Sequence, residues 1–144
     1  MKQSRRLKPI CDYKQRLEDE AAKRLAKSAQ EVSLQKQRLL DLENYRVEYD
    51  QQFQQTSSMG VSAKQMKDYH TFINNLGKVL DQQKAAIAAL EREYEEKKRQ
   101  WIAARNKTKA LSNVQFNYQK QEEIVEEKKQ QKEQDDRVGR IIRY

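Results

Sequence analysis

Apolar residues recur at steps of three and four along the second half of the chain, from Met66 to Tyr118. Two interleaved series start at Met66 and Tyr69 and repeat every seven residues, and together they hold apolar or aromatic residues at twelve of sixteen sites. This spacing, sustained over more than seven heptads, predicts a coiled-coil helix. Its predicted seam is formed by Met66, Tyr69, Ile73, Leu80, Ile87, Leu90, Tyr94, Trp101 and Leu111.

The first half of the chain repeats the same spacing less regularly. One series holds Leu25, Val32, Leu39 and Phe53, and the other holds Ala21, Leu42 and Tyr49. Polar residues interrupt both series, and before Ala21 the frame slips by one residue at Leu17. The pattern predicts a first helix over about residues 9–55 whose first turns are weakly specified.

The segment TSSMGVS, residues 56–62, is the one cluster of turn-forming residues in the chain. Ser62 and Gln65 have the spacing of a capping box, and Val61 and Met66 have that of a hydrophobic staple. Gly60 can take a positive φ just before them. A second helix should therefore begin at about residue 63 and run to about 136, followed by a flexible basic tail, 137–144.

Because the connection is short, the two helices must return antiparallel to each other. The predicted fold class is all-α, with one coiled-coil domain over residues 1–144 built as an antiparallel hairpin. Knobs-into-holes packing across the seam is satisfied when facing residue numbers sum to 122. A register shorter by one heptad is also compatible with the pattern.

Composition favours this thin fold over a compact one. Charged residues make up 36% of the chain, hydrophobic residues another 36%, and the mean hydropathy is −1.19. Such a mixture can cover one stripe per helix but cannot fill a compact core. Cys11 is the single cysteine, which excludes an internal disulfide and a cysteine-based zinc site. Without a secretory signal or an apolar run of about 20 residues, we expect a cytoplasmic protein.

The net charge of +8 is unevenly distributed. Residues 1–30 carry nine Lys/Arg and four Asp/Glu (+5), and residues 91–120 carry eight and four (+4). In a hairpin these blocks lie side by side, so we expect a basic open end. A solvated surface, binding of nucleic acid, and docking to an acidic protein partner all fit this charge. Because glutamates are interleaved with the basic residues, binding of nucleic acid fits less well than docking to an acidic protein partner.

No catalytic constellation is visible in the sequence. His70 is the single histidine and has no cysteine near it, and the chain lacks a glycine-rich phosphate loop and a nucleophile elbow. We therefore expect no enzyme activity, cofactor, metal or small-molecule ligand.

Apolar residues exceed what the seam needs on one flank close to the turn. Tyr45, Phe72 and Val79 each precede a seam position, and the antiparallel geometry places Tyr45 between the other two. We call these three, with the bordering residues, the turn flank: Leu42, Tyr45, Tyr49, Phe72, Leu76 and Val79. A locally wider seam is one interpretation, and a partner-binding surface is the one we favour.

Several segments together resemble the FliJ family, small cytoplasmic proteins of the bacterial flagellar type III export apparatus. These segments are RLLDLENYRVEY (38–49), the turn with Gly60, DYHTFINNLGKVLDQQ (68–83), Trp101 with its basic surroundings, and ALSNVQFNYQKQEE (110–123). The resemblance covers roughly residues 10–136. It implies a fold similar to the coiled coil of the γ stalk of rotary ATP synthases.

The resemblance also implies three partners: the hexameric export ATPase, which the chain would help to assemble and activate, the export gate membrane protein, and export chaperones. It places the gate contact on the turn flank and the ATPase contact at the terminal end. It also implies that the protein is associated with the inner face of the cytoplasmic membrane at the export apparatus. Val79 and Gln83 depart from the family pattern, which can have alanine and histidine there.

Other classes share parts of this pattern. The stalk protein of an injectisome secretion system would have the same fold and mechanism. A central-stalk subunit of a rotary ATPase would normally need a longer chain, and a basic coiled-coil nucleic-acid binder would show steeply salt-dependent binding.

Overall fold

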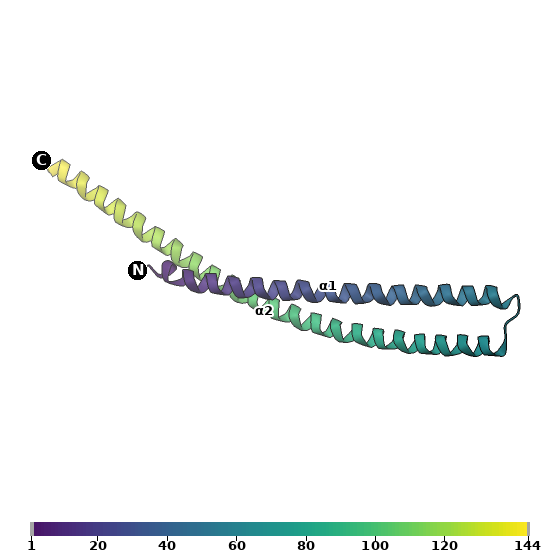
Figure 1. Ribbon diagram of the computed structural model, residues 1–144. Coiled ribbons are helices and arrows are strands. Elements are labelled where there is room, and N and C mark those ends of the chain that lie inside the picture. The colour runs from purple at the N-terminus through teal and green to yellow at the C-terminus, as the bar shows by residue number, and fades with distance from the viewer. Residues whose placement is uncertain (1, 144) are drawn as a thin grey trace. The chain divides into compact units, whose positions relative to one another are not determined.

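The computed structural model describes residues 2–143 and consists of two long helices. Helix α1 spans Gln3–Ser57 and helix α2 spans Ala63–Arg143. A short connection reverses the chain direction between them, so the helices form an antiparallel hairpin (Figure 1). No strand occurs in residues 2–143. The predicted all-α hairpin is thus confirmed.

Contacts within the hairpin divide it into two units, each described by itself below. The turn unit is Lys23–Arg99, and the terminal unit joins 2–22 to 100–143. The expected single domain over residues 1–144 stays a prediction.

In the turn unit, the seam of α2 follows the predicted steps of three and four. Leu76, Leu80 and Ile87 are buried, and the positions between and beyond them are half-buried. Met66 is the exception, because it is exposed at the start of α2. A polar layer crosses this seam, where the Gln83 side-chain amide donates to the backbone oxygen of Gln35 at 3.0 Å and to its Oε1 at 2.8 Å. The polar residue that interrupts the α1 series is thus matched by a polar residue of α2.

In the terminal unit, two hydrogen bonds define the register. The Thr108 hydroxyl donates to the backbone oxygen of Lys14 at 3.1 Å, and the Cys11 thiol lies 3.9 Å from the backbone oxygen of Leu111. The residue numbers in both pairs sum to 122, as expected for the longer of the two registers. In the turn unit, the stacked pair of Phe53 and Tyr69 also sums to 122.

The first turns of α1 differ from the sequence expectation. The helix begins at Gln3 rather than near residue 9, and Pro9 lies inside it. Pro9 has no N–H to donate to the carbonyl of Arg5, but both residues are exposed, so water can satisfy that carbonyl. The seam frame continues through Cys11 and Lys14 to Ser4, which is buried. The frame slip expected at Leu17 is therefore wrong, because polar and small residues occupy the seam there.

The C-terminal part of α2 also differs. Helix α2 continues to Arg143, whereas the sequence suggested an end near residue 136 and a loose tail. Tyr144, the last residue of that tail, lies outside the described residues. This part of α2 still pairs with α1 at Glu122, which bonds to Ser4. Since α1 starts six residues earlier than expected, it reaches further along α2.

The connection has the predicted chemistry. Gly60 has a φ of +96°, in the region that favours glycine. The Ser62 hydroxyl accepts from the Gln65 N–H at 3.1 Å, and the Gln65 side-chain oxygen accepts from the Ser62 N–H at 2.9 Å. This reciprocal pair is the capping box that starts α2, and it is confirmed. The staple between Val61 and Met66 stays a prediction.

Candidate partner-binding site

Five aromatic rings gather between the helices close to the turn, and we call them the aromatic cluster. They are Tyr45, Tyr49 and Phe53 of α1 with Tyr69 and Phe72 of α2. The α1 rings follow each other at steps of four and therefore share one face of the helix. The cluster belongs entirely to the turn unit.

The rings contact one another in sequence along the seam. Phe53 stacks on Tyr69 with centroids 3.8 Å apart and planes 9° from parallel. Tyr49 lies 5.9 Å from Tyr69 and 4.2 Å from Phe72. Tyr45 meets Phe72 edge-on at 6.1 Å, which confirms that these two residues share a flank. Stacked and edge-to-face pairs each add about 0.5–1.5 kcal/mol beyond area burial, so the cluster ties the helices together at the turn.

One carboxylate is bonded within this aromatic environment. The Tyr69 hydroxyl donates a hydrogen bond to Oδ1 of Asp50. This bond raises the pKa of Tyr69 above its ordinary value of 10.0, with smaller contributions from desolvation and from the charge of Asp50. The cause is that the neutral phenol donates the bond, whereas the phenolate would face the carboxylate.

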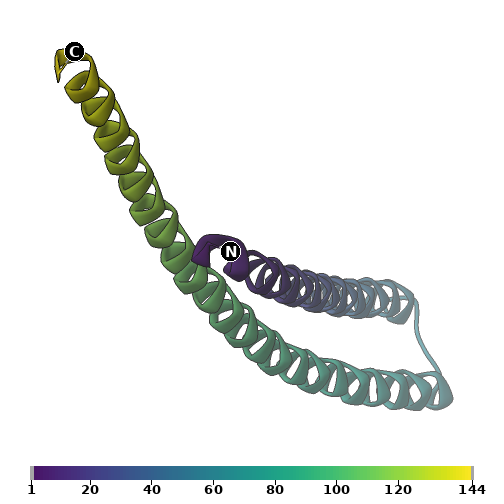
Figure 2. The same ribbon diagram turned by 90° about the vertical axis from the view of Figure 1, so that its left-hand side faces the viewer.

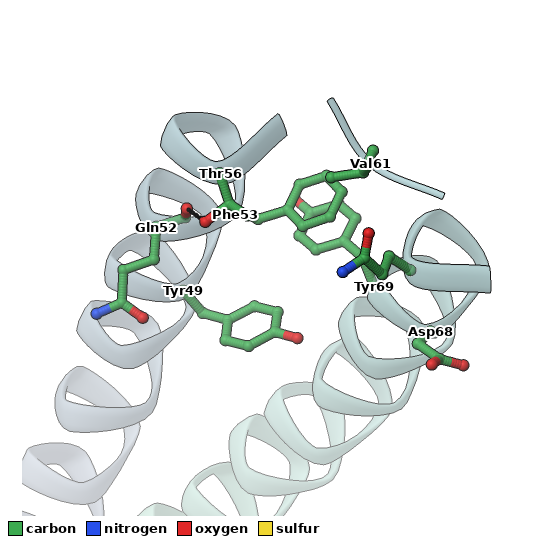
Figure 3. A pocket seen from close by; sticks show the side chains of 8 residues that line it. Tyr49, Gln52, Phe53, Thr56, Val61, Asp68 and Tyr69 are labelled. Carbon is green, nitrogen blue, oxygen red and sulfur yellow. Dashed lines mark hydrogen bonds between the residues drawn. The ribbon is translucent and has the colours of Figure 1, made fainter. Parts of the chain in front are cut away.

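A pocket of about 320 Å³ opens beside the stacked pair (Figure 3). Tyr49, Phe53 and Tyr69 line it from the two helices, and Val61 lines it from the connection. In Figure 3 the Tyr49 ring points into the space between the helices, below the stacked rings of Phe53 and Tyr69. The pocket therefore adjoins the turn flank and shares Tyr49 with it.

The six residues predicted to form the turn flank are unequally accessible. Tyr45 and Val79 are exposed by 49% and 45%, whereas Leu76 is buried, with only 8% of its surface exposed. Leu42, Tyr49 and Phe72 are half-buried. Leu76 therefore belongs to the seam, and Tyr45 and Val79 offer the free apolar surface. The role of all six in binding stays a prediction.

The heptad pattern places Phe53 and Tyr69 in the seam only, although they also continue the aromatic cluster. Their rings extend it from Tyr49 to the connection. The spacing of Tyr45, Tyr49 and Phe53 was the signal available in the sequence. The bond to Asp50 had no such signal, since it depends on the partner helix.

His70 lies at the edge of the cluster, with its ring 5.5 Å from that of Tyr69. It is exposed. Across residues 2–143, no group of three or more His, Cys, Asp or Glu side chains is arranged to hold a metal ion.

The basic start of α1 has acidic neighbours. Lys2 and Arg5 line one hollow together with Glu122, Glu123 and Glu126 of α2. The expected basic open end did not include these glutamates, because they lie outside its two blocks, residues 1–30 and 91–120. In the terminal unit the described residues hold 16 Lys/Arg and 11 Asp/Glu, a net charge of +5. The basic character remains, but α2 partly neutralises it at the start of α1.

A coiled-coil hairpin with an aromatic cluster near its turn and no arranged metal-binding group in residues 2–143 has the form of a helical binding protein. A family model described as "Flagellar FliJ protein" matches residues 2–143, and the chain belongs to this FliJ family. It is thus a component of the flagellar export apparatus. No curated protein and no solved structure gives a significant match. Within residues 2–143, neither helix has a stretch apolar enough to cross a membrane.

Proposed function

We propose that this chain is a non-enzymatic stalk of the flagellar export apparatus that contacts the export gate membrane protein through the turn flank. The observation that carries the proposal is the exposed Tyr45 beside Phe72 in the aromatic cluster. Tyr45 contacts Phe72 on one side and keeps 49% of its surface exposed, so part of its ring is available to a partner. Anchors of this kind dominate binding energy at protein interfaces.

The structure also supports a rigid presentation of this surface. Tyr49 contacts both Phe72 and Tyr69, and Tyr69 is held by Asp50. Since these rings are already ordered, they would lose less side-chain entropy when a partner binds. Val79 continues the exposed surface about two turns beyond Phe72 along α2.

The chain would also contact the hexameric export ATPase. One coiled coil inside a six-fold ring cannot contact all subunits equally, so it would bias their nucleotide states and promote ring assembly and activity. The terminal unit supplies the charged surface for this contact, with a net charge of +5. Its attraction to an acidic ring surface should weaken as salt rises.

The chain would further escort export chaperones at the apparatus. Family membership supports this role. We place the chain at the cytoplasmic face of the membrane, since the gate and the ATPase meet there.

The gate contact is tested by replacing Tyr45 and Phe72 with alanine. The double variant should bind the cytoplasmic part of the gate protein at least about tenfold more weakly, because truncating an aromatic hot-spot residue costs about 2 kcal/mol or more. Binding is measured by isothermal titration calorimetry, and helicity by circular dichroism. Unchanged affinity of a helical double variant would refute the assignment of the turn flank.

Tyr13→Ala with Phe116→Ala is the matched control. Both residues are exposed, Tyr13 by 50% and Phe116 by 62%, and both lie in the terminal unit. The control should bind the gate protein like the wild type.

For the ATPase, the purified enzyme should assemble into rings and hydrolyse ATP faster when the chain is added.

A further inference from the structure

The last part of α2 carries an exposed face that no other segment in residues 2–143 covers. In Figures 1 and 2 the yellow end of α2 continues past the start of α1 with no helix beside it. The face is formed at steps of three and four by Ile124, Glu127, Gln131, Gln134, Val138 and Ile141. All six side chains are exposed, Ile141 by 75%.

This face, which we call the distal face, points away from α1. Glu122 bonds to Ser4 at the start of α1. Ile124 follows two residues later, which is about 200° around the helix. The start of α1 therefore leaves the distal face free for another helix.

We infer that a second copy of this chain covers the distal face in an antiparallel arrangement. The register is the one in which facing residue numbers sum to 265. It places Ile124 against Ile141 of the second copy, Val138 against Glu127, and Gln131 against Gln134. Each pair occurs twice, because the two-fold axis repeats it.

Charge complementarity selects this orientation. Residues 121–136 hold three Lys and seven Asp/Glu, a net charge of −4, and residues 137–143 hold three Arg, a net charge of +3. An antiparallel pair sets the acidic stretch of one copy against the basic end of the other. A parallel pair would set like charges side by side and would be repelled.

The residues that flank the distal face give the same result. In an antiparallel coiled coil, each flank lies beside the equivalent flank of the other helix. Arg137 then lies beside Glu123 of the second copy, and Lys128 lies beside Asp135. The matched register thus yields opposite charges on both sides of the seam.

The dimer is weak because glutamines occupy its centre and its ion pairs are in water. It forms at high protein concentration and loses affinity as ionic strength rises. Since the distal face can be used only once at a time, the dimer excludes any other partner of residues 124–141. This inference does not depend on the role of the turn flank.

Analytical ultracentrifugation of the full chain at low salt tests the inference. The average mass of the wild type should rise toward that of a dimer with increasing concentration. Arg137→Glu should raise the dissociation constant about tenfold, because two ion pairs become two repulsions. Adding Glu123→Arg to this variant should restore the affinity.

Arg143→Glu is the matched control, since it makes the same charge change on the opposite side of the helix. It should alter the dissociation constant by no more than about twofold. A wild type that stays monomeric at every concentration overturns the inference. So does an equal loss for the 137 and 143 variants, which would mean that net charge alone matters.

A disulfide test gives the orientation in a Cys11→Ser background. Mixing Glu127→Cys chains with Val138→Cys chains should produce crosslinked dimers under oxidation. Glu127→Cys chains alone should not crosslink, because their two cysteines would lie about 16 Å apart along the pair, beyond disulfide reach. Crosslinking of the Glu127→Cys chains alone would overturn the antiparallel register. Monomers that sediment with phosphatidylserine vesicles would instead identify the distal face as a lipid-binding one.

Discussion

Ser4 and Glu122 lie 118 positions apart in the chain, yet α2 caps the start of α1 through them. Oε1 of Glu122 accepts from the Ser4 N–H at 3.2 Å, and Oε2 accepts from the Ser4 hydroxyl at 2.6 Å. Gln115 adds a bond from its side-chain amide to the backbone oxygen of Ser4 at 3.1 Å. The first N–H groups of a helix have no partner within it and favour a negative charge. Glu122 of α2 supplies both a hydrogen-bond acceptor for the Ser4 N–H and a negative charge.

The charge of Glu122 should make this cap sensitive to acid. Its bond from the Ser4 hydroxyl lowers the pKa of Glu122 below its ordinary value of 4.5. A lowered pKa in the folded state stabilises the fold above the ordinary value, and this contribution is lost as pH falls through the folded pKa. Glu122→Gln should therefore weaken amide-exchange protection in the first turns of α1 at neutral pH. The difference from the wild type should vanish in acid.

Glu123→Gln is the control for this prediction. Glu123 lines the same hollow and is exposed. It makes the same change of charge one residue away, and it should leave the protection of α1 unchanged at both pH values. Equal protection in wild type and Glu122→Gln at neutral pH would contradict the capping role.

The polar layer of Gln83 and Gln35 should contribute to stability. Gln83→Ala removes both hydrogen bonds and leaves the Gln35 side chain without this partner in the seam. The free energy of unfolding should fall by about 1–3 kcal/mol. Urea denaturation followed by circular dichroism measures it, and Gln82→Ala, an exposed neighbour, should change it by less than about 0.5 kcal/mol.

The bond between Tyr69 and Asp50 should stabilise the fold only while the phenol keeps its proton. The pKa of Tyr69 is raised in the folded state. The contribution is therefore complete below the ordinary tyrosine pKa and is lost as pH rises through the folded pKa. Tyr69→Phe should lower the melting temperature at neutral pH, and the difference should shrink in strong alkali.

Asp50→Asn gives an independent check on the same bond. Without the carboxylate, the pKa of Tyr69 should move back toward its ordinary value, because a neutral amide oxygen accepts the bond more weakly and does not repel the phenolate. Ultraviolet absorbance of tyrosinate should then show one tyrosine titrating at lower pH than in the wild type. Tyr13→Phe in the Asp50→Asn chain should leave that change in place.

Two glycines should respond to alanine with opposite signs. Gly60 has a φ of +96°, where a Cβ is strained whatever space surrounds it. Gly77 lies inside α2 with no atom within 4 Å of an added Cβ. Gly60→Ala should lower the free energy of unfolding by about 1 kcal/mol, and Gly77→Ala should raise it by about 0.5–1 kcal/mol. Chemical denaturation of both variants measures the difference, and the same sign for both would contradict the assigned turn.

The sequence alone determined the helices of the turn unit, the place of the connection and the apolar positions of the seam in that unit. These features depend on local spacing: steps of three and four define a helical face, and Gly60, Ser62 and Gln65 act on residues next to them. The turn flank could be predicted for the same reason, since Tyr45 and Phe72 both precede seam positions. The resemblance to the FliJ family rested on the order of such segments.

The tertiary structure alone decided what happens where the pattern is weak. Ser4 and Lys14 give no apolar signal, and they join the seam because Glu122, Gln115 and Thr108 of α2 satisfy their polar groups. Likewise, the burial of Leu76 and the exposure of Tyr45 depend on how the facing helix covers each side chain. A hydrogen bond or a contact between residues more than a hundred positions apart leaves no periodic mark in either segment, so it becomes visible only when the two helices are packed together.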